Sequence, residues 1–349
     1  MKKRSGNALL SIVLVDAHFT IESELRALGC KVLALRPGGG FFALRDLLGE
    51  EWLRPDLFVQ MERLDARSYF EGLENLPCPT FFWAIDSHLN MFWQKWYTKL
   101  FDAVLTPHVS LFSTLPDFFR PIALHSFTWP GLRRDFVPHA DRKRALGLCA
   151  RIDAHRPLRA SLLALLKDRG LEHNGNPELK QADIFTFYAD TKVVPNESLT
   201  FEVNYRLLEA ASCGCMVLSP DAGEDQNTLL EPGREFLVYH DGLELLDFVD
   251  FARRRPLVAE KIGLTAARRV TAEHLPPQRA HKLLEIALNT PRARLSGPAA
   301  RMALWLCLAM QIRNHALPFS AAEHADKGMS FLWGPERNRS EAVRPLLAH

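Results

Sequence analysis

The sequence predicts an α/β protein of two Rossmann-like domains, each built on a parallel sheet, with a helical C-terminal part. Three observations predict this fold class. Short apolar runs alternate with segments of helical period through the first 130 residues, a second alternating series begins near residue 145, and the pattern is helical from about residue 256. Continuous apolar strands separated by helices are typical of βαβ units, whose sheet is covered on both faces.

The first series predicts a domain at residues 1–138. Its expected strands are 9–15, 31–35, 57–61, 80–85, 103–106 and 122–125. Its expected helices include 21–28, 43–48 and 68–73. A stretch containing Pro130, Gly131 and Pro138, followed by the polar run 141–144, predicts the linker that ends it.

The second series predicts a domain at residues 139–275, and a cleft between the two domains follows from this layout. Its expected strands are 145–152, 192–194, 216–218 and 236–239. Its expected helices are 158–167, 183–188, 201–212, 225–230 and 243–251. Further helical segments at 258–271, 278–289 and 299–314 predict that residues 276–349 form a helical extension packed back on the body.

The composition excludes several classes of protein. The chain has 349 residues, 47% hydrophobic and 24% charged, which is typical of a globular protein, and its net charge of +2 gives no basic field for nucleic acid. Of the six cysteines only Cys213 and Cys215 are close, without redox or zinc spacing, so we expect reduced thiols and a cytoplasmic location. No apolar run reaches the length of a membrane span, which leaves only peripheral membrane association open. The 13 histidines are scattered, and we expect no metal site.

The segment 195–220 contains the most informative pattern. A loop is followed by the expected helix 201–212, a turn at Gly214 and an apolar strand. Glu202, Arg206 and Glu209 are three or four residues apart, so on this helix they would share one face. A charged face just past a strand end is where α/β proteins bind nucleotides, although a solvated helix face has the same spacing.

Two arginines follow the first strand of the second domain. Arg151 is expected at the strand end, and Arg156 at the start of the next helix. Guanidinium groups beside a helix N-terminus suit a diphosphate, because both the charges and the helix dipole favour an anion. The alternative is that both arginines solvate a loop.

Catalytic candidates follow a strand of the first domain. Asp86 and His88 come just after the strand 80–85, at the sheet edge where sites form. Asp86 could act as a general base with His88 nearby, or it could cap the next helix. His18 and His108 are weaker candidates. The aromatic residues of this region suit a sugar face or, more simply, the core; they are Trp83, Phe92, Trp93, Trp96 and Tyr97.

The pattern Asn204-x-Arg206-x-x-Glu209-Ala210-x-x-x-Gly214, beside the arginine pair and the two-domain layout, resembles GT-B glycosyltransferases. The likeness is closest to the CgeB-like group of glycosyltransferase family 1, and is strongest over residues 145–255. It implies a GT-B fold whose second domain binds a nucleotide sugar. It implies that Glu209 accepts hydrogen bonds from ribose hydroxyls and that the arginine pair holds the diphosphate. The donor-binding residues it implies are Arg151, Arg156, Asn196, Ser198, Glu202, Asn204, Arg206 and Glu209.

The resemblance implies transfer of a sugar, of hexosyl type, from a nucleotide diphosphate sugar to a hydroxyl of a glycan, protein or small molecule, without metal or other cofactor. This sequence departs from the family pattern in places. Glu202 and Glu209 are seven apart where retaining members have eight, and Ala150 replaces a glycine. The Gly-Gly turn of the first domain is replaced by residues 16–18. A catalytically degenerate module that binds a nucleotide sugar or a partner, and a nucleotide-sugar epimerase, are therefore the alternatives.

Overall fold

The computed structural model describes residues 9–152, 157–175, 180–198, 200 and 202–313. The chain divides into two compact units, one formed by residues 129–279 and one by the segments on either side, 1–128 and 280–349. Each unit has its own parallel sheet. The predictions of an α/β fold with parallel sheets and of a helical C-terminal part are confirmed. Within the described part of the chain, no helix is both long and apolar enough to cross a membrane.

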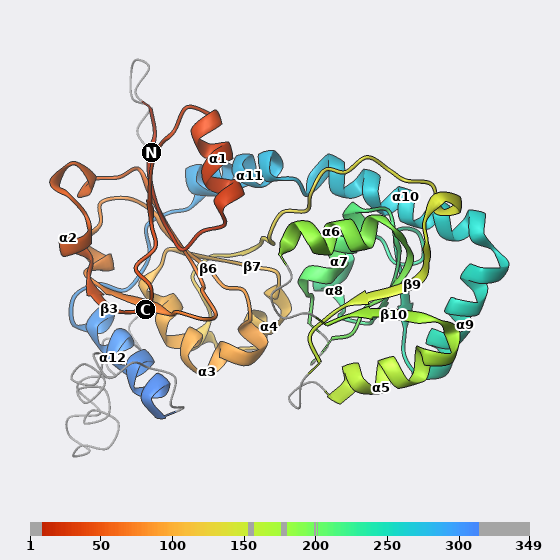
Figure 1. The fold of residues 1–349 in the computed structure, drawn as a ribbon. Helices are drawn as coiled ribbons and strands as arrows, with labels where there is room; N and C mark the ends of the chain where they lie inside the picture. The colour runs from red at the N-terminus through yellow and green to blue at the C-terminus, as the bar shows by residue number, and fades with distance from the viewer. Residues whose placement is uncertain (1–8, 153–156, 176–179, 199, 201, 314–349) are drawn as a thin grey trace. The chain divides into compact units, whose positions relative to one another are not determined.

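The first unit is built on a six-stranded parallel sheet of order β2-β1-β4-β6-β7-β8 (Figure 1). Its strands are β1 Ser11–Val15, β2 Lys31–Leu35, β4 Leu57–Met61, β6 Thr80–Trp83, β7 Ala103–Thr106 and β8 Leu124–Ser126. The central strands are buried along their length, because a parallel sheet is covered by helices on both faces. This burial explains why these strands are continuous apolar runs in the sequence.

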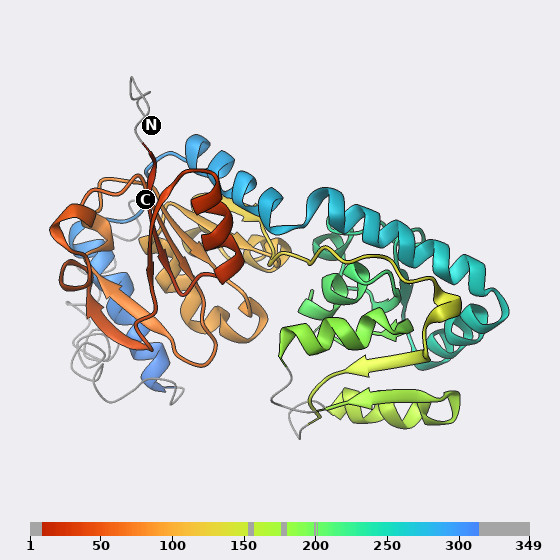
Figure 2. The same ribbon diagram turned by 45° about the horizontal axis from the view of Figure 1, so that its top comes forward.

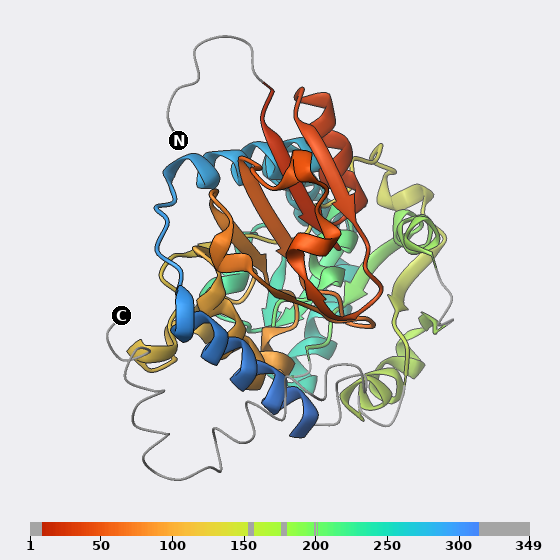
Figure 3. The ribbon, with the colours of Figure 1, turned by 90° about the vertical axis from the view of Figure 1, so that its left-hand side faces the viewer.

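Helices from both ends of the chain cover this sheet. Figures 1 and 3 show α3 and α12 on one side and α1 and α11 on the other, and α12 packs directly against α3. The helices are α1 Phe19–Ala27, α2 Leu44–Leu47, α3 Ser87–Tyr97, α4 Val109–Ser113, α11 Pro276–Asn289, whose first residues belong to the second unit, and α12 Gly297–Arg313. Short 3-10 turns lie at Glu50–Trp52, Leu73–Asn75, Thr98–Leu100 and Asp117–Phe119 in this unit, and at His139–Asp141 and Lys167–Arg169 in the other.

One predicted helix of this unit is wrong. Residues 68–73 were expected to be helical, but Ser68–Glu71 forms β5, which pairs in parallel with β3, Gly40–Ala43. Ser68, Tyr69 and Phe70 are all buried, so the segment has no solvent-facing side that an amphipathic helix would show. Gly38, Gly39 and Gly40 lead into β3 with positive φ angles, a conformation that favours glycine.

The second unit is built on a five-stranded parallel sheet of order β10-β9-β11-β12-β13. Its strands are β9 Arg144–Cys149, β10 Leu171–Asn174, β11 Thr191–Pro195, β12 Met216–Pro220 and β13 Leu237–Tyr239. Its helices are α5 Pro157–Leu166, α6 Gln181–Ala189, α7 Tyr205–Ser212, α8 Glu224–Asn227, α9 Gly242–Arg254 and α10 Pro256–Glu273. Helices α6, α7 and α10 pack on one face, and α5 and α9 on the other (Figure 2).

Close backbone packing fixes α7 and β12 against α10. Gly214, with φ of 72°, makes the turn from α7 to β12. Gly263 of α10 lies so near this turn that an added Cβ would be 2.1 Å from the Gly214 carbonyl oxygen. Arg142 is buried beside the turn and donates to the carbonyl oxygens of Thr191 at 2.6 Å and Cys213 at 2.7 Å. These contacts hold α7, which carries the candidate site, in a fixed place on the sheet.

A buried ion pair joins the C-terminal segment to the first unit. Asp102, which is fully buried, pairs with Arg294 and accepts hydrogen bonds from the backbone N–H groups of Ala293, Arg294 and Thr80. Leu295 donates its N–H to the Lys99 carbonyl oxygen at 3.0 Å. The first unit is therefore completed by residues that follow the second unit in the chain.

Candidate functional site

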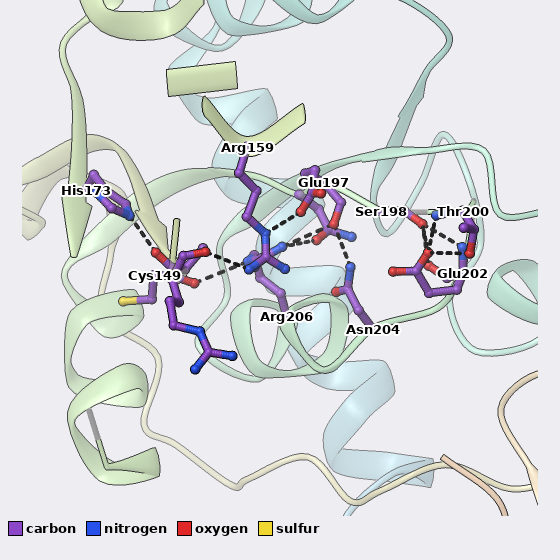
Figure 4. Close-up of polar contacts among 12 residues, drawn as sticks. Cys149, Arg159, His173, Glu197, Ser198, Thr200, Glu202, Asn204 and Arg206 are labelled. Carbon is purple, nitrogen blue, oxygen red and sulfur yellow. Dashed lines mark hydrogen bonds and ion pairs between the residues drawn. The ribbon is translucent and has the colours of Figure 1, made fainter. Parts of the chain in front are cut away.

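In the second unit, polar side chains converge where β9 and β11 end. The loop after β9, the first turn of α5, the loop after β11 and the first turns of α7 meet at this edge (Figure 4). The carboxyl ends of parallel strands form the ligand-binding edge of open α/β sheets, because helix N-termini and loops gather there. This placement agrees with the expectation for segment 195–220.

Arg206 on α7 is the centre of this cluster. Its side chain is buried, and Nη1 donates to the Asn196 side-chain oxygen at 2.6 Å and to the Glu197 carbonyl oxygen at 3.3 Å. Its Nε donates to the Cys149 carbonyl oxygen at 3.4 Å. Asn196 is itself fixed, because its amide donates to Ser219 and its carbonyl oxygen accepts from the Tyr239 hydroxyl. The strand ends and α7 are thereby joined through one guanidinium group.

Glu209 lies on α7, three residues after Arg206, and is half-buried. No hydrogen bond or ion pair joins its carboxylate to any residue that the structure describes. Burial raises its pKa to about 7, and the Arg206 charge opposes that rise only in part. A half-buried carboxylate without a protein partner is an acceptor that a ligand hydroxyl could satisfy.

Arg159 is a residue of this site that sequence reasoning missed. It lies in the first turn of α5, and its Nε is 2.5 Å from the Glu197 carboxylate, with both side chains largely buried. Its Nη1 donates to the Arg151 carbonyl oxygen at 2.9 Å. Its signal in the sequence is its position three residues after Arg156. The pair joins α5 to the loop after β11, and Glu197 balances the charge of Arg159.

The loop before α7 differs from the prediction. The helix begins at Tyr205, so Glu202 lies in the loop and does not share a helix face with Arg206 and Glu209. The physical reason is local: the Glu202 carboxylate accepts from the Ser198 hydroxyl at 2.6 Å and from the Thr200 N–H at 2.6 Å, which closes the loop on itself. The Ser198 hydroxyl in turn accepts the Glu202 N–H. Glu202 and Ser198 therefore stabilise the loop.

Asn204 occupies the N-cap position of α7, but its side chain makes no capping hydrogen bond. Its amide donates instead to the Glu197 carbonyl oxygen at 2.8 Å, and its buried side-chain oxygen has no hydrogen-bond partner among the residues described. An unsatisfied buried acceptor costs about 1–3 kcal/mol, so it marks a place where a donor group is missing. That Asn204 lies near the ligand remains a prediction. Its side-chain oxygen supports this prediction, because a donor group of the ligand could satisfy it.

Of the two arginines predicted to hold the diphosphate, the structure describes only Arg151. Arg151 is exposed just beyond the end of β9, at the edge where the cluster lies. Arg156 lies outside the described residues. Ala150, in the place of the family glycine, accepts a hydrogen bond from the His173 ring through its carbonyl oxygen.

In the first unit, Asp86 follows β6 at the carboxyl edge of the sheet. It occupies the N-cap position of α3, but its side chain makes no capping hydrogen bond, so helix capping by this carboxylate is not observed. A second carboxylate, which sequence reasoning missed, holds its backbone: Glu62 Oε2 accepts the N–H groups of Ile85 at 2.7 Å and Asp86 at 2.9 Å. Burial raises the pKa of Glu62 to about 7. Its only signal in the sequence was its position directly after a strand.

The histidines of this edge lie partly together. The rings of His88 and His108 are in edge-to-face contact, with centroids 5.4 Å apart. His18 instead caps α1, since its Nδ1 accepts the Thr20 N–H, and burial lowers its pKa. Asp16, where the family has a Gly-Gly turn, has a φ of 52°, the left-handed conformation that glycine adopts more readily.

The aromatic residues near Asp86 belong mainly to the core. Trp83, Trp93 and Tyr97 are fully or almost fully buried, whereas Phe92 and Trp96 are partly buried. Core packing was the simpler of the two expectations for them. Among the residues described, no group of three or more His, Cys, Asp or Glu side chains could hold a metal ion.

Comparison with known proteins matches one segment of the sequence to a family model and the structure to solved folds. Residues 129–285 match a family model described as glycosyl transferase-like. No curated protein matches the chain. The structure resembles Anabaena HepE, solved in complex with UDP and glucose, with a TM-score of 0.51 and 13% identity over 79% of this chain and 98% of that one. A glycosyltransferase from Rickettsia africae gives a TM-score of 0.49, with 11% identity over 82% of this chain and 100% of the other.

The chain therefore contains a glycosyltransferase-like domain, and its fold class is GT-B. The matched segment includes β9 to α10, and so the whole cluster around Arg206 and Glu209. The assignment to the CgeB-like group remains a prediction.

Proposed function

We propose that this protein transfers a sugar, of hexosyl type, from a nucleoside diphosphate sugar to an acceptor hydroxyl, without a metal ion. The observation that carries the proposal is the Glu209 carboxylate, half-buried and without a hydrogen bond to any described residue, one helical turn from the anchored Arg206. A carboxylate suits a ribose because it can accept hydrogen bonds from both hydroxyls of the cis-diol. The glycosyl transferase-like domain match supports this assignment.

The diphosphate would lie at the N-terminus of α5. Arg151 supplies positive charge there, the ion pair of Arg159 and Glu197 fixes the loop after β11 against the helix, and the helix dipole favours an anion at the same place. Such groups stabilise the charge that develops on a departing nucleoside diphosphate. In this proposal they take the part that a divalent cation has in other transferases, and Asp86 of the first unit removes the proton of the acceptor hydroxyl.

A donor screen tests the proposal. UDP-, GDP- and TDP-sugars are added to the full chain, beginning with UDP-glucose because the Anabaena structure holds UDP and glucose. We expect one nucleotide to raise the melting temperature and its sugar to be transferred to water or an added acceptor, at the same rate with and without EDTA. A donor present at 100 times its Kd stabilises the fold by about 2.7 kcal/mol, which is readily measured.

The outcomes separate the alternatives. Stabilisation by a donor without turnover, over a broad set of acceptors, would identify a binding module that has lost catalysis. The Glu202 carboxylate favours that alternative, because the loop itself occupies it. Release of a rearranged nucleotide sugar without acceptor would identify an epimerase. If no nucleotide sugar shifted the melting temperature, the proposed donor site would be wrong.

A further inference from the structure

A separate cavity lies at the opposite end of the second unit's sheet from the candidate site. Its volume is about 520 Å³, and it is lined by the first residues of β9 and β11, the end of α9 and the first turn of α10. The candidate site lies where β9 and β11 end. A strand of five or six residues spans roughly 16–20 Å, so the cavity is a distinct place on the domain.

The walls of this cavity are mainly apolar. Nine of its fourteen lining residues are apolar, among them Leu146, Val249 and Leu257. Leu257, at the edge of the cavity, is 80% exposed. Cavities of about 300–1,000 Å³ with apolar walls and a few polar groups are typical of small-molecule sites. The walls therefore favour a ligand with an apolar body.

Three of the polar lining residues are already satisfied or neutral. Arg169 makes a two-point ion pair with Asp250, at 3.1 and 3.0 Å. The Glu260 carboxylate accepts a hydrogen bond from the backbone N–H of His139 at 2.5 Å. Burial lowers the pKa of His139, which keeps its ring neutral at physiological pH. None of these three groups leaves a positive charge for a ligand.

The other two polar lining residues are cations. Lys192, at the start of β11, and Arg253, at the end of α9, make no hydrogen bond or ion pair with any residue in the described ranges. The end of α9 and the start of α10 meet beside the cavity, so the negative end of one helix dipole offsets the positive end of the other, and the positive charge comes from the two side chains. Set against the one charge of Glu260, the two cations leave an excess of one positive charge.

We propose that this cavity binds an amphiphilic monoanion. The apolar chain of the ligand lies against Leu146, Val249 and Leu257, and its carboxylate or phosphate is held by Lys192 and Arg253. Such a ligand satisfies both features of the cavity, because its chain covers the apolar wall and its head group neutralises the excess charge. The proposal does not depend on the glycosyl transfer proposed above.

Calorimetric titration of the full chain with decanoate tests the proposal, with 1-decanol as the uncharged comparison. We expect saturable binding of decanoate with one site per chain, and weaker binding of decanol. Lys192→Gln and Arg253→Gln should each weaken decanoate about three- to tenfold, as expected for partly exposed charges that bind an anion. Leu257→Ser should weaken both compounds. The matched control is Arg254→Gln, an exposed arginine next to Arg253 that does not line the cavity, and it should change affinity less than twofold.

Three results would overturn the proposal: no saturable decanoate binding, equal affinity for decanol and decanoate, or an equal loss of affinity in Arg254→Gln and Arg253→Gln. A second arm, co-sedimentation with phosphatidylglycerol vesicles, identifies the source of the ligand. Sedimentation that decanoate abolishes points to a membrane lipid, whereas decanoate binding without sedimentation points to a free amphiphile. Both results support the cavity as the site.

Discussion

Glu209, an acceptor in the proposed donor site, costs the fold stability when its carboxylate is ionised. The free energy of a buried carboxylate depends on its ionisation, because burial without a hydrogen-bond donor penalises the charged form. Its pKa of about 7 lies above the usual value of 4.5, so the native protein binds a proton more tightly than the unfolded chain does. The stability that this proton gives is fully present below about pH 4.5 and is lost as the pH rises to about 7.

This difference predicts the behaviour of Glu209→Gln. Below about pH 4.5 the variant and the native protein should have similar unfolding free energies, and above pH 7 the variant should be more stable by up to about 3 kcal/mol. Donor affinity should fall about ten- to a hundredfold, because a carboxylate acceptor is lost. Urea unfolding at several pH values and donor titration measure the two effects. Glu224→Gln, an exposed control in the same unit, should show neither effect, and a variant no more stable at pH 8 would contradict the argument.

Asp86→Asn separates catalysis from structure in the first unit. The side chain does not cap α3, so the amide loses no helix cap, and we expect the variant to keep the native fold and its cooperative unfolding. If Asp86 is the general base, turnover should fall about a hundredfold or more while the donor Kd stays unchanged. Steady-state rates and donor titration give the two values. Asp117→Asn, at an exposed aspartate of the same unit, is the control; equal rates for Asp86→Asn and the native enzyme would exclude this role.

At the scale of elements, the contact between α10 and the turn at Gly214 decides where α7 lies. In an exposed helix, replacing glycine by alanine stabilises by about 1 kcal/mol. At Gly263 the added Cβ would meet the Gly214 carbonyl oxygen at 2.1 Å, and backbone atoms cannot move aside as a flexible side chain can. The steric effect therefore outweighs the helix propensity.

Gly263→Ala should destabilise the second unit by about 1–3 kcal/mol. It should also weaken donor binding, since α7 carries Arg206 and Glu209. Thermal unfolding and donor titration measure both changes. Gly242→Ala is the matched control: its Cβ would be 3.1 Å from the end of the Leu165 side chain, which can rotate, so we expect little change. A stabilised Gly263→Ala variant would show that the contact is looser than described.

The sequence predicted most elements but not the details of the site. The strands 31–35, 57–61 and 103–106 were predicted with the observed bounds, because a buried parallel strand is an unbroken apolar run. The run 68–71 was mistaken for a helix, since only pairing with a distant strand makes it extended.

The details of the site were harder to predict. The start of α7 was placed four residues early, because hydrogen bonds between Glu202 and Ser198 close a loop that periodicity does not reveal. The partnership of Arg159 with Glu197 depends on two strands being adjacent, which no local pattern gives.

At the scale of the whole molecule, one unit is continuous in sequence and the other is not. The second unit is residues 129–279, whereas the first needs both flanking segments. The buried pair of Asp102 and Arg294 and the packing of α12 on α3 join those segments. Removing one partner of a buried ion pair costs about 3–5 kcal/mol, a large fraction of a typical domain's stability.

A fragment of residues 129–279 should therefore fold alone and retain donor affinity within about tenfold of the full chain. A fragment of residues 1–128 should not fold cooperatively, because it leaves Asp102 buried without Arg294 and exposes the core that α12 covers. Circular dichroism melts and donor titration of the two fragments check this. Addition of residues 280–349 as a separate peptide should restore a cooperative unfolding transition to the fragment of residues 1–128. Cooperative unfolding of residues 1–128 alone would contradict the dependence.

The discontinuous unit also sets an order of events during synthesis. A chain grows at about 5–20 residues per second, so Arg294 is made roughly ten to forty seconds after Asp102. Through that interval the face of the sheet that α12 will cover is open to other chains. The inserted unit can meanwhile complete its own fold. Cells that make this protein quickly, or at high temperature, should depend on a chaperone that covers the first sheet until the last helix arrives.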